Sequence, residues 1–154
     1  MTTATRTDLK QHWIPVKDCD PRAVALYKRH YSSRKGNVDW LRYGFSGVGE
    51  SLILLTVDCR ALFGWRRQNL RDDGQTGIEC FVFRNMGDLL SSTLILQAEV
   101  WAFSKWERQR LFSFVDSKKI QSTNPGYCFL QAGWQKCGHS KGGLLILEKL
   151  PNGH

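Results

Sequence analysis

A carboxylate, a glycine-containing turn and a helix start follow one another between Gly77 and Ser92, in the sequence GIECFVFRNMGDLLSS. The first part alternates as a strand does and carries Glu79 among apolar residues. The run breaks at Arg84–Gly87, and a helical pattern follows over about Leu90–Trp106. A strand that ends in such a turn directs free N–H groups and the positive end of the helix dipole at one spot. This stretch predicts an anion site for the diphosphate of a nucleotide-like cofactor.

Glu79 is the first candidate for acid–base chemistry. Burial among apolar neighbours favours the protonated form of a carboxyl group and makes it a proton acceptor near neutral pH. A strand residue that faces solvent is an equally good interpretation. Asp116, at the end of a predicted strand, is an alternative base, although VDSKK also fits an ordinary turn. His30 is a further candidate, and a lone histidine on a helix is more often structural.

The chain of 154 residues has a net charge of +8, and 42% of its residues are hydrophobic. A chain of this length buries a core without disulfide bonds. We therefore expect one globular domain over residues 1–154, with a frayed start at 1–10. The positive charge favours an acidic partner, most simply nucleic acid, and the alternative is a soluble protein that happens to be basic.

The cysteines and histidines favour a reducing compartment and no metal site. Five cysteines are scattered without a C-x-x-C pair, and four histidines lack zinc-ligand spacing. No apolar run reaches transmembrane length, and the N-terminus has no apolar signal segment. The expectation is a cytoplasmic protein with no membrane partner, of the host-cell cytoplasm if the chain is phage-encoded. The sequence leaves the oligomeric state open.

Basic residues lie beside tryptophans at two places. The clusters are Trp65 with Arg66, Arg67 and Arg71, and Trp106 with Lys105, Arg108 and Arg110. Such clusters suit phosphate contacts and stacking on an extruded base. A basic solvated face over core tryptophans is the alternative. The glycine-rich, aromatic segment 37–50 reads as a loop over a binding site, or as a surface loop whose rings fill the core.

The elements that must position these groups follow from hydrophobic periodicity and turn signals. Strands are predicted at 12–19, 51–58, 60–68, 77–84, 110–116 and 143–150, and helices at 20–31, 90–106 and 124–134. Strands 51–58 and 60–68 form a hairpin across a tight turn. This order predicts an α/β fold around a mixed sheet. The hairpin and the lack of a G-x-G-x-x-G motif argue against a Rossmann fold.

The element order resembles that of the GNAT acyltransferase superfamily over nearly the whole chain. That superfamily binds acetyl-coenzyme A with a Q/R-x-x-G-x-G/A turn between its central strand and the next helix. Arg84–Asp88 fits the first part of this motif. Leu89 then replaces the final small residue, and Asp88 adds a negative charge beside the proposed diphosphate. The resemblance implies a mixed, mostly antiparallel central sheet flanked by helices.

Three shorter motifs are similar to a phage-type branch of the superfamily that includes the Mom DNA-modification protein. They are His30-Tyr31-Ser32, Arg84-Asn85 followed by Ser91-Ser92, and the block from Asn124 to Trp134. The branch implies a transferase that places an acyl or related group on a nucleobase amine in DNA and so protects the DNA from restriction. The alternatives are an ordinary small-molecule or protein N-acetyltransferase and a non-catalytic nucleic-acid-binding module.

The resemblance also implies roles for single residues. Acyl transfer requires a base for the amine and an acid for the leaving thiolate. Glu79 is the expected base and Tyr127 the expected acid, while Asp116 could orient Tyr127. The implied cofactor is acetyl-coenzyme A or a related thioester, held by Phe83, Arg84, Asn85, Gly87, Ser91, Ser92 and Asn124. The residues assigned to the acceptor are Tyr31, Ser32, Trp40, Arg42, Arg66 and Arg67.

Overall fold

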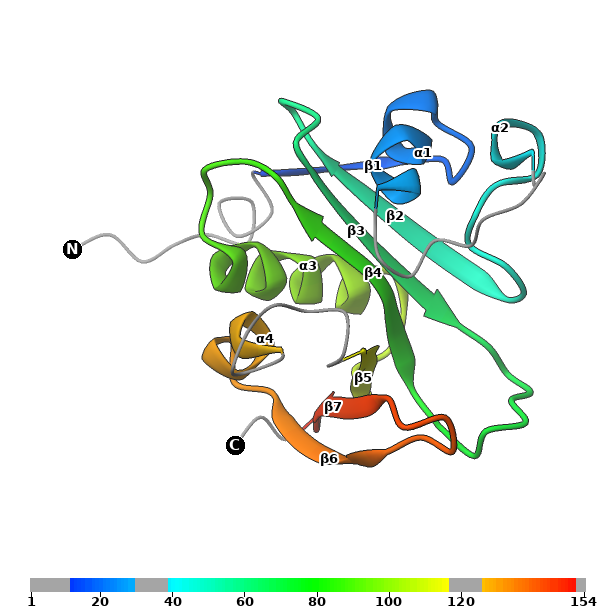
Figure 1. Ribbon diagram of the computed structural model, residues 1–154, viewed down its shortest axis with the longest axis vertical. Helices are drawn as coiled ribbons and strands as arrows, with labels where there is room; N and C mark the ends of the chain where they lie inside the picture. Colours follow the sequence, from blue (N-terminus) through cyan, green and yellow to red (C-terminus); the bar gives the residue numbers. More distant parts are fainter. Residues whose placement is uncertain (1–11, 30–38, 117–125, 152–154) are drawn as a thin grey trace.

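The computed structural model describes residues 12–29, 39–116 and 126–151 (Figure 1). Within these ranges a seven-stranded sheet has the strand order β1-β2-β3-β4-β5-β7-β6. The strands are β1 (Trp13–Val16), β2 (Glu50–Thr56), β3 (Ala61–Arg67), β4 (Ile78–Asn85), β5 (Leu111–Val115), β6 (Gln135–His139) and β7 (Leu145–Lys149). Only β4 and β5 pair in parallel. The predicted mixed, mostly antiparallel sheet is confirmed; segment 1–10 lies outside the described residues.

Helices cover both faces of the sheet. They are α1 (Pro21–Lys28), α2 (Trp40–Tyr43), α3 (Ser91–Lys105) and α4 (Tyr127–Gln131). Residues of α3 and α4 share one apolar cluster with the sheet, and residues of α1 share a second. In Figure 1 the long strands β2, β3 and β4 separate α1 and α2 from α3 and α4. This arrangement is the helix-flanked sheet that the sequence predicted.

Helix α1 begins as its sequence predicts. Asp20 is the N-cap and accepts a hydrogen bond from the backbone N–H of Arg22 at 2.9 Å, and Pro21 occupies the first helical position. The hairpin of β2 and β3 also forms, with Leu55 opposite Leu62. Local capping and turn residues therefore account for the start of α1 and for the β2–β3 hairpin.

Strand β4 contains a bulge that the sequence pattern did not reveal. Opposite β3, Gly64 pairs with Val82 and Trp65 pairs with Cys80, so Phe81 is the extra residue. Phe81 and Val82 both pack against the α1 cluster, which breaks the strict alternation expected for this strand. A Cβ atom at Gly64 would lie 2.7 Å from the side chains of both residues, so glycine leaves room for the bulge.

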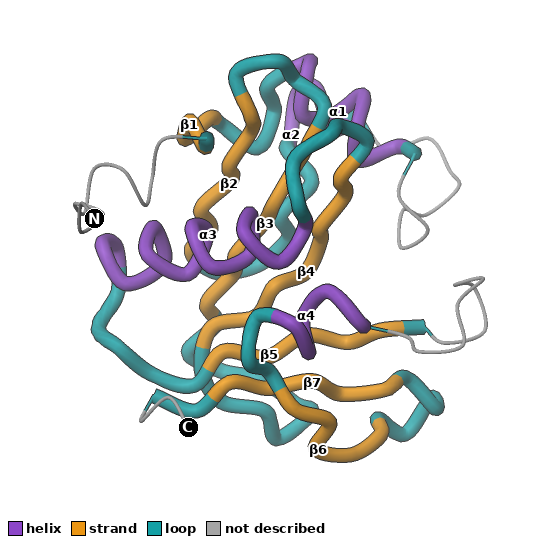
Figure 2. Tube along the Cα trace, turned by 90° about the vertical axis from the view of Figure 1, so that its left-hand side faces the viewer, coloured by secondary structure: helices purple, strands orange, loops and turns teal. Residues whose placement is uncertain are grey.

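Strands β4 and β5 diverge after a short parallel contact. Their three paired positions are Ile78 with Leu111, Glu79 with Phe112, and Cys80 with Ser113. At the last pair, Ser113 Oγ donates a hydrogen bond to the Cys80 carbonyl at 2.8 Å. Figure 2 shows β2 to β4 running up the picture while β5 and β7 run across it. Beyond Cys80, no described strand pairs with this edge of β4.

Two elements were missed by sequence analysis. Helix α2 lies inside the segment predicted as a loop, where Asp39 Oδ1 accepts a hydrogen bond from the backbone N–H of Arg42 at 3.2 Å. All five residues of β6 are exposed, so this edge strand has no apolar alternation to recognise. Strand β6 is defined instead by its antiparallel pairing with β7. The helix predicted at 124–134 is shorter, as α4.

Candidate active site

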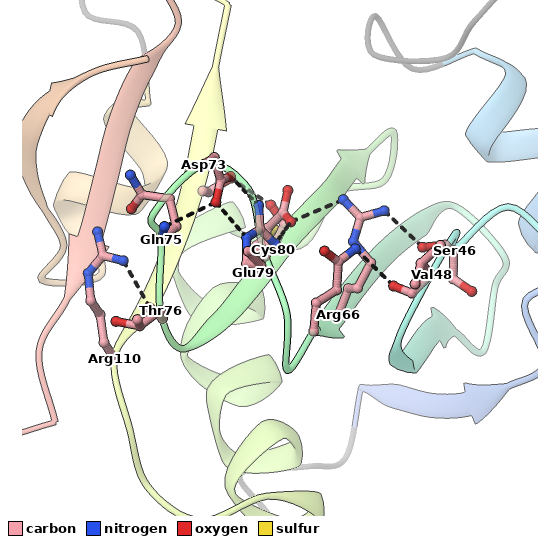
Figure 3. Close-up of polar contacts among 12 residues, drawn as sticks. Ser46, Val48, Arg66, Asp73, Gln75, Thr76, Glu79, Cys80 and Arg110 are labelled. Atoms are coloured by element: carbon pink, nitrogen blue, oxygen red, sulfur yellow. Dashed lines mark hydrogen bonds and ion pairs between the residues drawn. The ribbon is translucent and has the colours of Figure 1, made fainter. Parts of the chain in front are cut away.

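Glu79 is a buried carboxylate on the central strand. Only 5% of its surface is exposed, so the interpretation of a solvent-facing strand residue is wrong. Its Oε1 accepts a hydrogen bond from Arg66 Nη2 at 3.0 Å (Figure 3) and another from Arg71 Nη1 at 2.8 Å. Within the described residues its Oε2 accepts none. Glu79 is therefore held at one oxygen by two cations, and does not have the purely apolar surroundings that its sequence neighbours suggest.

The two arginines are themselves anchored. Arg66 Nη1 donates to the carbonyl of Ser46 at 2.9 Å, while Arg71 donates through Nε and Nη2 to both oxygens of Asp73, at 2.9 and 2.6 Å. Hydrogen bonds from Arg71 lower the pKa of Asp73 to about 2. Two cations and two carboxylates thus balance one another, and the position of Glu79 is set from both sides (Figure 3).

Asn85 organises the turn between β4 and α3. Its Oδ1 accepts a hydrogen bond from the Gly87 N–H at 3.0 Å, and its Nδ2 donates to the Leu89 carbonyl at 2.7 Å and to Ser91 Oγ at 3.0 Å. Leu90 is the N-cap residue of α3, and it makes no side-chain capping bond. The first N–H groups of α3 are therefore open to an external anion.

The charges around this turn are unevenly paired. Arg84 Nε is buried without a hydrogen-bond partner, and Arg84 makes no ion pair with any described residue. Asp88 is exposed and lies 3.4 Å from Arg60 Nη1, which offsets its charge. Arg60 Nη2 also donates to the Met86 carbonyl at 2.9 Å. The turn therefore carries a half-buried arginine, Arg84, whose Nε has no hydrogen-bond partner among the described residues.

The other predicted catalytic and cofactor residues are less tightly placed. Tyr127 is the first residue of α4 and is 55% exposed. Phe83 contacts the Phe129 ring edge-on at 6.0 Å and so joins β4 to α4. Asp116 directly follows β5 and is half-buried. Gly87, Ser91 and Ser92 belong to the β4–α3 turn and first helical residues. Asn124 and His30 lie outside the described residues.

The residues assigned to the acceptor do not form one cluster. Arg66 belongs to the Glu79 network, whereas Arg67 donates to Gln109 Oε1 at 3.3 Å and to Asn69 Oδ1 at 2.8 Å. Trp40 packs edge-on against the Tyr27 ring at 4.9 Å, and Arg42 lies over the Tyr43 ring at 5.3 Å. Tyr31 and Ser32 lie outside the described residues.

The tryptophans beside the basic clusters are core residues. Trp65 is fully buried, and its Nε1 donates to the Ala98 carbonyl at 2.8 Å. Trp106 is also buried, with Nε1 3.3 Å from Glu50 Oε2. Neither ring is free to stack on a base, so that interpretation of the two clusters is wrong. The alternative interpretation, a basic solvated face over core tryptophans, describes both clusters.

Sequence analysis placed Arg71 only in the basic cluster beside Trp65 and left Asp73 unassigned, whereas the structure brings both into the Glu79 network. The only other signal was an arginine followed two residues later by an aspartate, which is common in polar turns. Among the described residues no group of three His, Cys, Asp or Glu side chains could hold a metal ion. None of the helices in the described ranges has both the length and the apolar character needed to cross a bilayer.

Comparison with known proteins identifies the fold. No family model matches the chain, and no curated protein matches it. A solved structure from Bordetella pertussis, provisionally described as a GNAT-family acetyltransferase, covers 89% of this chain and 95% of its own, with a TM-score of 0.51 and 13% identity. At that identity the likeness shows the fold alone. The predicted GNAT-like fold is confirmed, and no comparison links the chain to the Mom branch.

Proposed function

We propose that this protein transfers an acyl group from a coenzyme A thioester to an amine, and that the amine belongs to a base in DNA. The observation that carries the first part is the meeting of three features at the end of β4 in a GNAT-like fold. Strand β4 diverges from β5, helix α3 starts without a side-chain cap, and Arg84 Nε has no partner among the described residues. Each of these is a place where an elongated, anionic thioester ligand would be held.

The residues at this position fit such a ligand. An uncapped helix start binds phosphate through its N–H groups. A buried donor without a partner costs about 1–3 kcal/mol, which a diphosphate contact to Arg84 would offset. Asn85 and Gly87 would hold the turn in shape, with Ser91 and Ser92 at the helix start. The free edge of β4 past Cys80 offers backbone groups to the rest of the ligand, and Phe83 and Asn124 are the remaining proposed contacts.

The chain's own side chains would perform the proton transfers. When bound, the thioester supplies an activated acyl group, so that a C–N bond to the amine forms as the C–S bond breaks. Glu79 Oε2 receives the proton that the amine loses, because Oε1 is occupied by the two arginines. The phenol of Tyr127 donates a proton to the leaving sulfur. Asp116 and His30 are the alternative proton-transfer groups.

The DNA acceptor is supported by charge. A net charge of +8 favours a polyanionic partner. Trp65 and Trp106 are buried and cannot stack on a base. The proposal of a DNA acceptor therefore depends on contacts between basic side chains and phosphate groups. An ordinary N-acetyltransferase would instead act on amines with no DNA present. A non-catalytic binding module is favoured by Leu89 and Asp88 in the turn, and it would bind no coenzyme A species.

Ligand-induced stabilisation tests the cofactor. At 100 times its Kd, acetyl-coenzyme A should stabilise the fold by about 2.7 kcal/mol, or roughly 5–10 °C in Tm. Arg84→Gln should shrink this shift, whereas Arg22→Gln, which removes an exposed arginine of α1, should leave it intact. An unchanged Tm and no heat in calorimetry would show the cofactor assignment to be wrong. Mass spectrometry of nucleosides from DNA of expressing cells tests the acceptor.

A further inference from the structure

We propose that a hollow lined by Asp73, which Arg71 links to Glu79, binds one nucleotide unit, free or within a single strand, as the acceptor of the transfer. This proposal rests on the proposed acyl-transfer function. The hollow has a volume of about 720 Å³ and lies between the β3–β4 connection at 72–75 and the β6–β7 turn at 139–142. That volume lies within the roughly 300–1,000 Å³ of small-molecule sites. Of the acceptor residues expected from the sequence, the four that the structure describes (Trp40, Arg42, Arg66 and Arg67) do not line it.

The floor of the hollow is apolar and includes an aromatic ring. Phe114 of β5 lies there with Leu144 and Ile146. Phe114 is half-buried and contacts the Phe112 ring edge-on at 5.9 Å. A partly exposed ring in a hollow is a surface on which a flat base can stack. The buried tryptophans cannot serve this purpose, and Phe114 can.

The β6–β7 turn supplies the positive wall. His139 and Lys141 line the hollow, are exposed, and make no ion pair within the described chain. The turn is closed by bonds from the Ser140 N–H to the Leu144 carbonyl at 2.8 Å and from the Gly143 N–H to the Ser140 carbonyl at 3.0 Å. The N–H groups of Lys141 and Gly142 have no partner in the described residues. This wall is suited to a phosphate group.

The β3–β4 connection supplies the opposite wall. Both oxygens of Asp73 are taken by Arg71, whereas Asp72 is exposed and without an ion pair among the described residues. Asp72 can accept hydrogen bonds from the N–H groups of a base. A nucleotide separates its phosphate from its base N–H groups by a sugar, and it also uses the apolar floor.

The hollow lies next to the proposed chemistry. Phe112 is the strand partner of Glu79, and Phe114 is two residues further along β5, about 7 Å away. Arg71 connects the two places directly, because it binds both Asp73 on the wall and Glu79 on β4. A base held on Phe114 would therefore lie close to the network of Asp73, Arg71 and Glu79.

Calorimetry with the four deoxynucleoside 5′-monophosphates and with a short single-stranded oligonucleotide tests the proposal. The variants are Lys141→Gln, Asp72→Asn and Phe114→Leu. The control is Lys17→Gln, an exposed lysine between β1 and α1. We expect binding that each of the three variants weakens by about fivefold or more and that the control leaves unchanged. Circular dichroism verifies that Phe114→Leu is folded. Changes in the NMR chemical shifts of the backbone amides at 72–75 and 139–142 report whether the ligand occupies the hollow.

The results separate the two ligand sources and the two proposals. Binding of a monophosphate supports a free nucleotide, and binding of the oligonucleotide alone supports a unit within a strand, provided that the variants weaken it. No binding of either ligand, or binding that the three variants leave unchanged, overturns the proposed hollow site. A separate acetyl-coenzyme A melting shift decides the acyl-transfer function. If acetyl-coenzyme A gives no melting shift but nucleotides still bind, only the proposed acyl-transfer function is overturned.

Discussion

Arg71 and Glu79 form a buried ion pair, with 2.8 Å between Nη1 and Oε1. Arg71 comes from the β3–β4 connection and Glu79 from the central strand. The same guanidinium holds Asp73, which borders the hollow, at 2.6 Å. The wall of the proposed acceptor site and the proposed base are thus fastened to each other by one side chain. The site depends on a residue that lies in no helix or strand.

Breaking this pair should destabilise the fold. Arg71→Met leaves Glu79 buried with Arg66 as its remaining cation, so we expect a loss of about 2–4 kcal/mol in the free energy of unfolding. Arg22→Met is the control, because its pair with Asp20 is exposed to solvent and should contribute much less than the buried pair. Urea denaturation measures both. Equal losses would show that burial of the Glu79 network has no energetic consequence.

The proton-transfer assignments predict large kinetic effects. Glu79→Gln and Tyr127→Phe keep side-chain size and remove the titrating group. Each should lower turnover by about a hundredfold or more while the protein stays folded. Steady-state acyl transfer with each purified variant gives the measurement. Turnover like that of the wild type would remove the residue from the mechanism and direct attention to Asp116 and His30.

Asp73 should contribute stability that is lost in acid. Its pKa is about 2, against 3.8 for the free side chain, because Arg71 hydrogen-bonds to it. A lowered pKa gives stability that is complete above the unfolded value and is lost as pH falls from about 4 to 2. The wild type should therefore lose its stability advantage over Asp73→Asn across this window. A difference between the two that is independent of pH would contradict the pairing.

Glu99 should behave in the opposite way. Burial raises its pKa above 4.5 despite hydrogen bonds from Lys149 and Trp134. A raised pKa gives a contribution that is complete below the unfolded value and is lost as pH rises through the folded one. Glu99→Gln keeps an acceptor without the charge, so its stability relative to the wild type should rise as the pH is increased above 4.5. Urea denaturation at several pH values measures this, and a flat difference would refute it.

Binding to DNA should weaken steeply with salt if phosphate contacts dominate. Arg67 and Arg108 bond only to neutral groups among the described residues, so Arg67→Gln or Arg108→Gln should flatten the salt slope by about one unit each. Arg66→Gln should flatten it less, because Glu79 already offsets its charge. Weak binding at low salt that is indifferent to added salt would count against a DNA partner.

Local sequence determined most of the framework. The Asp20-Pro21 start of α1, the hairpin of β2 and β3, and the strand–turn–helix from Ile78 to Lys105 all follow from caps, turns and periodicity. These signals lie within a few residues of the structures they predict. The carboxylate at position 79 and the turn and helix start that follow β4 could be identified for the same reason.

Tertiary structure alone decided what surrounds them. Glu79 meets Arg66 and Arg71 because neighbouring strands and a folded connection bring them together, and the bulge at Phe81 exists only opposite Gly64. Burial of Trp65 under α3 likewise depends on packing. The hollow joins segments 72–75 and 139–142, which are remote in sequence. Contacts between residues far apart in the sequence depend on how the whole chain folds. Hydrophobic periodicity within one segment carries no information about those contacts.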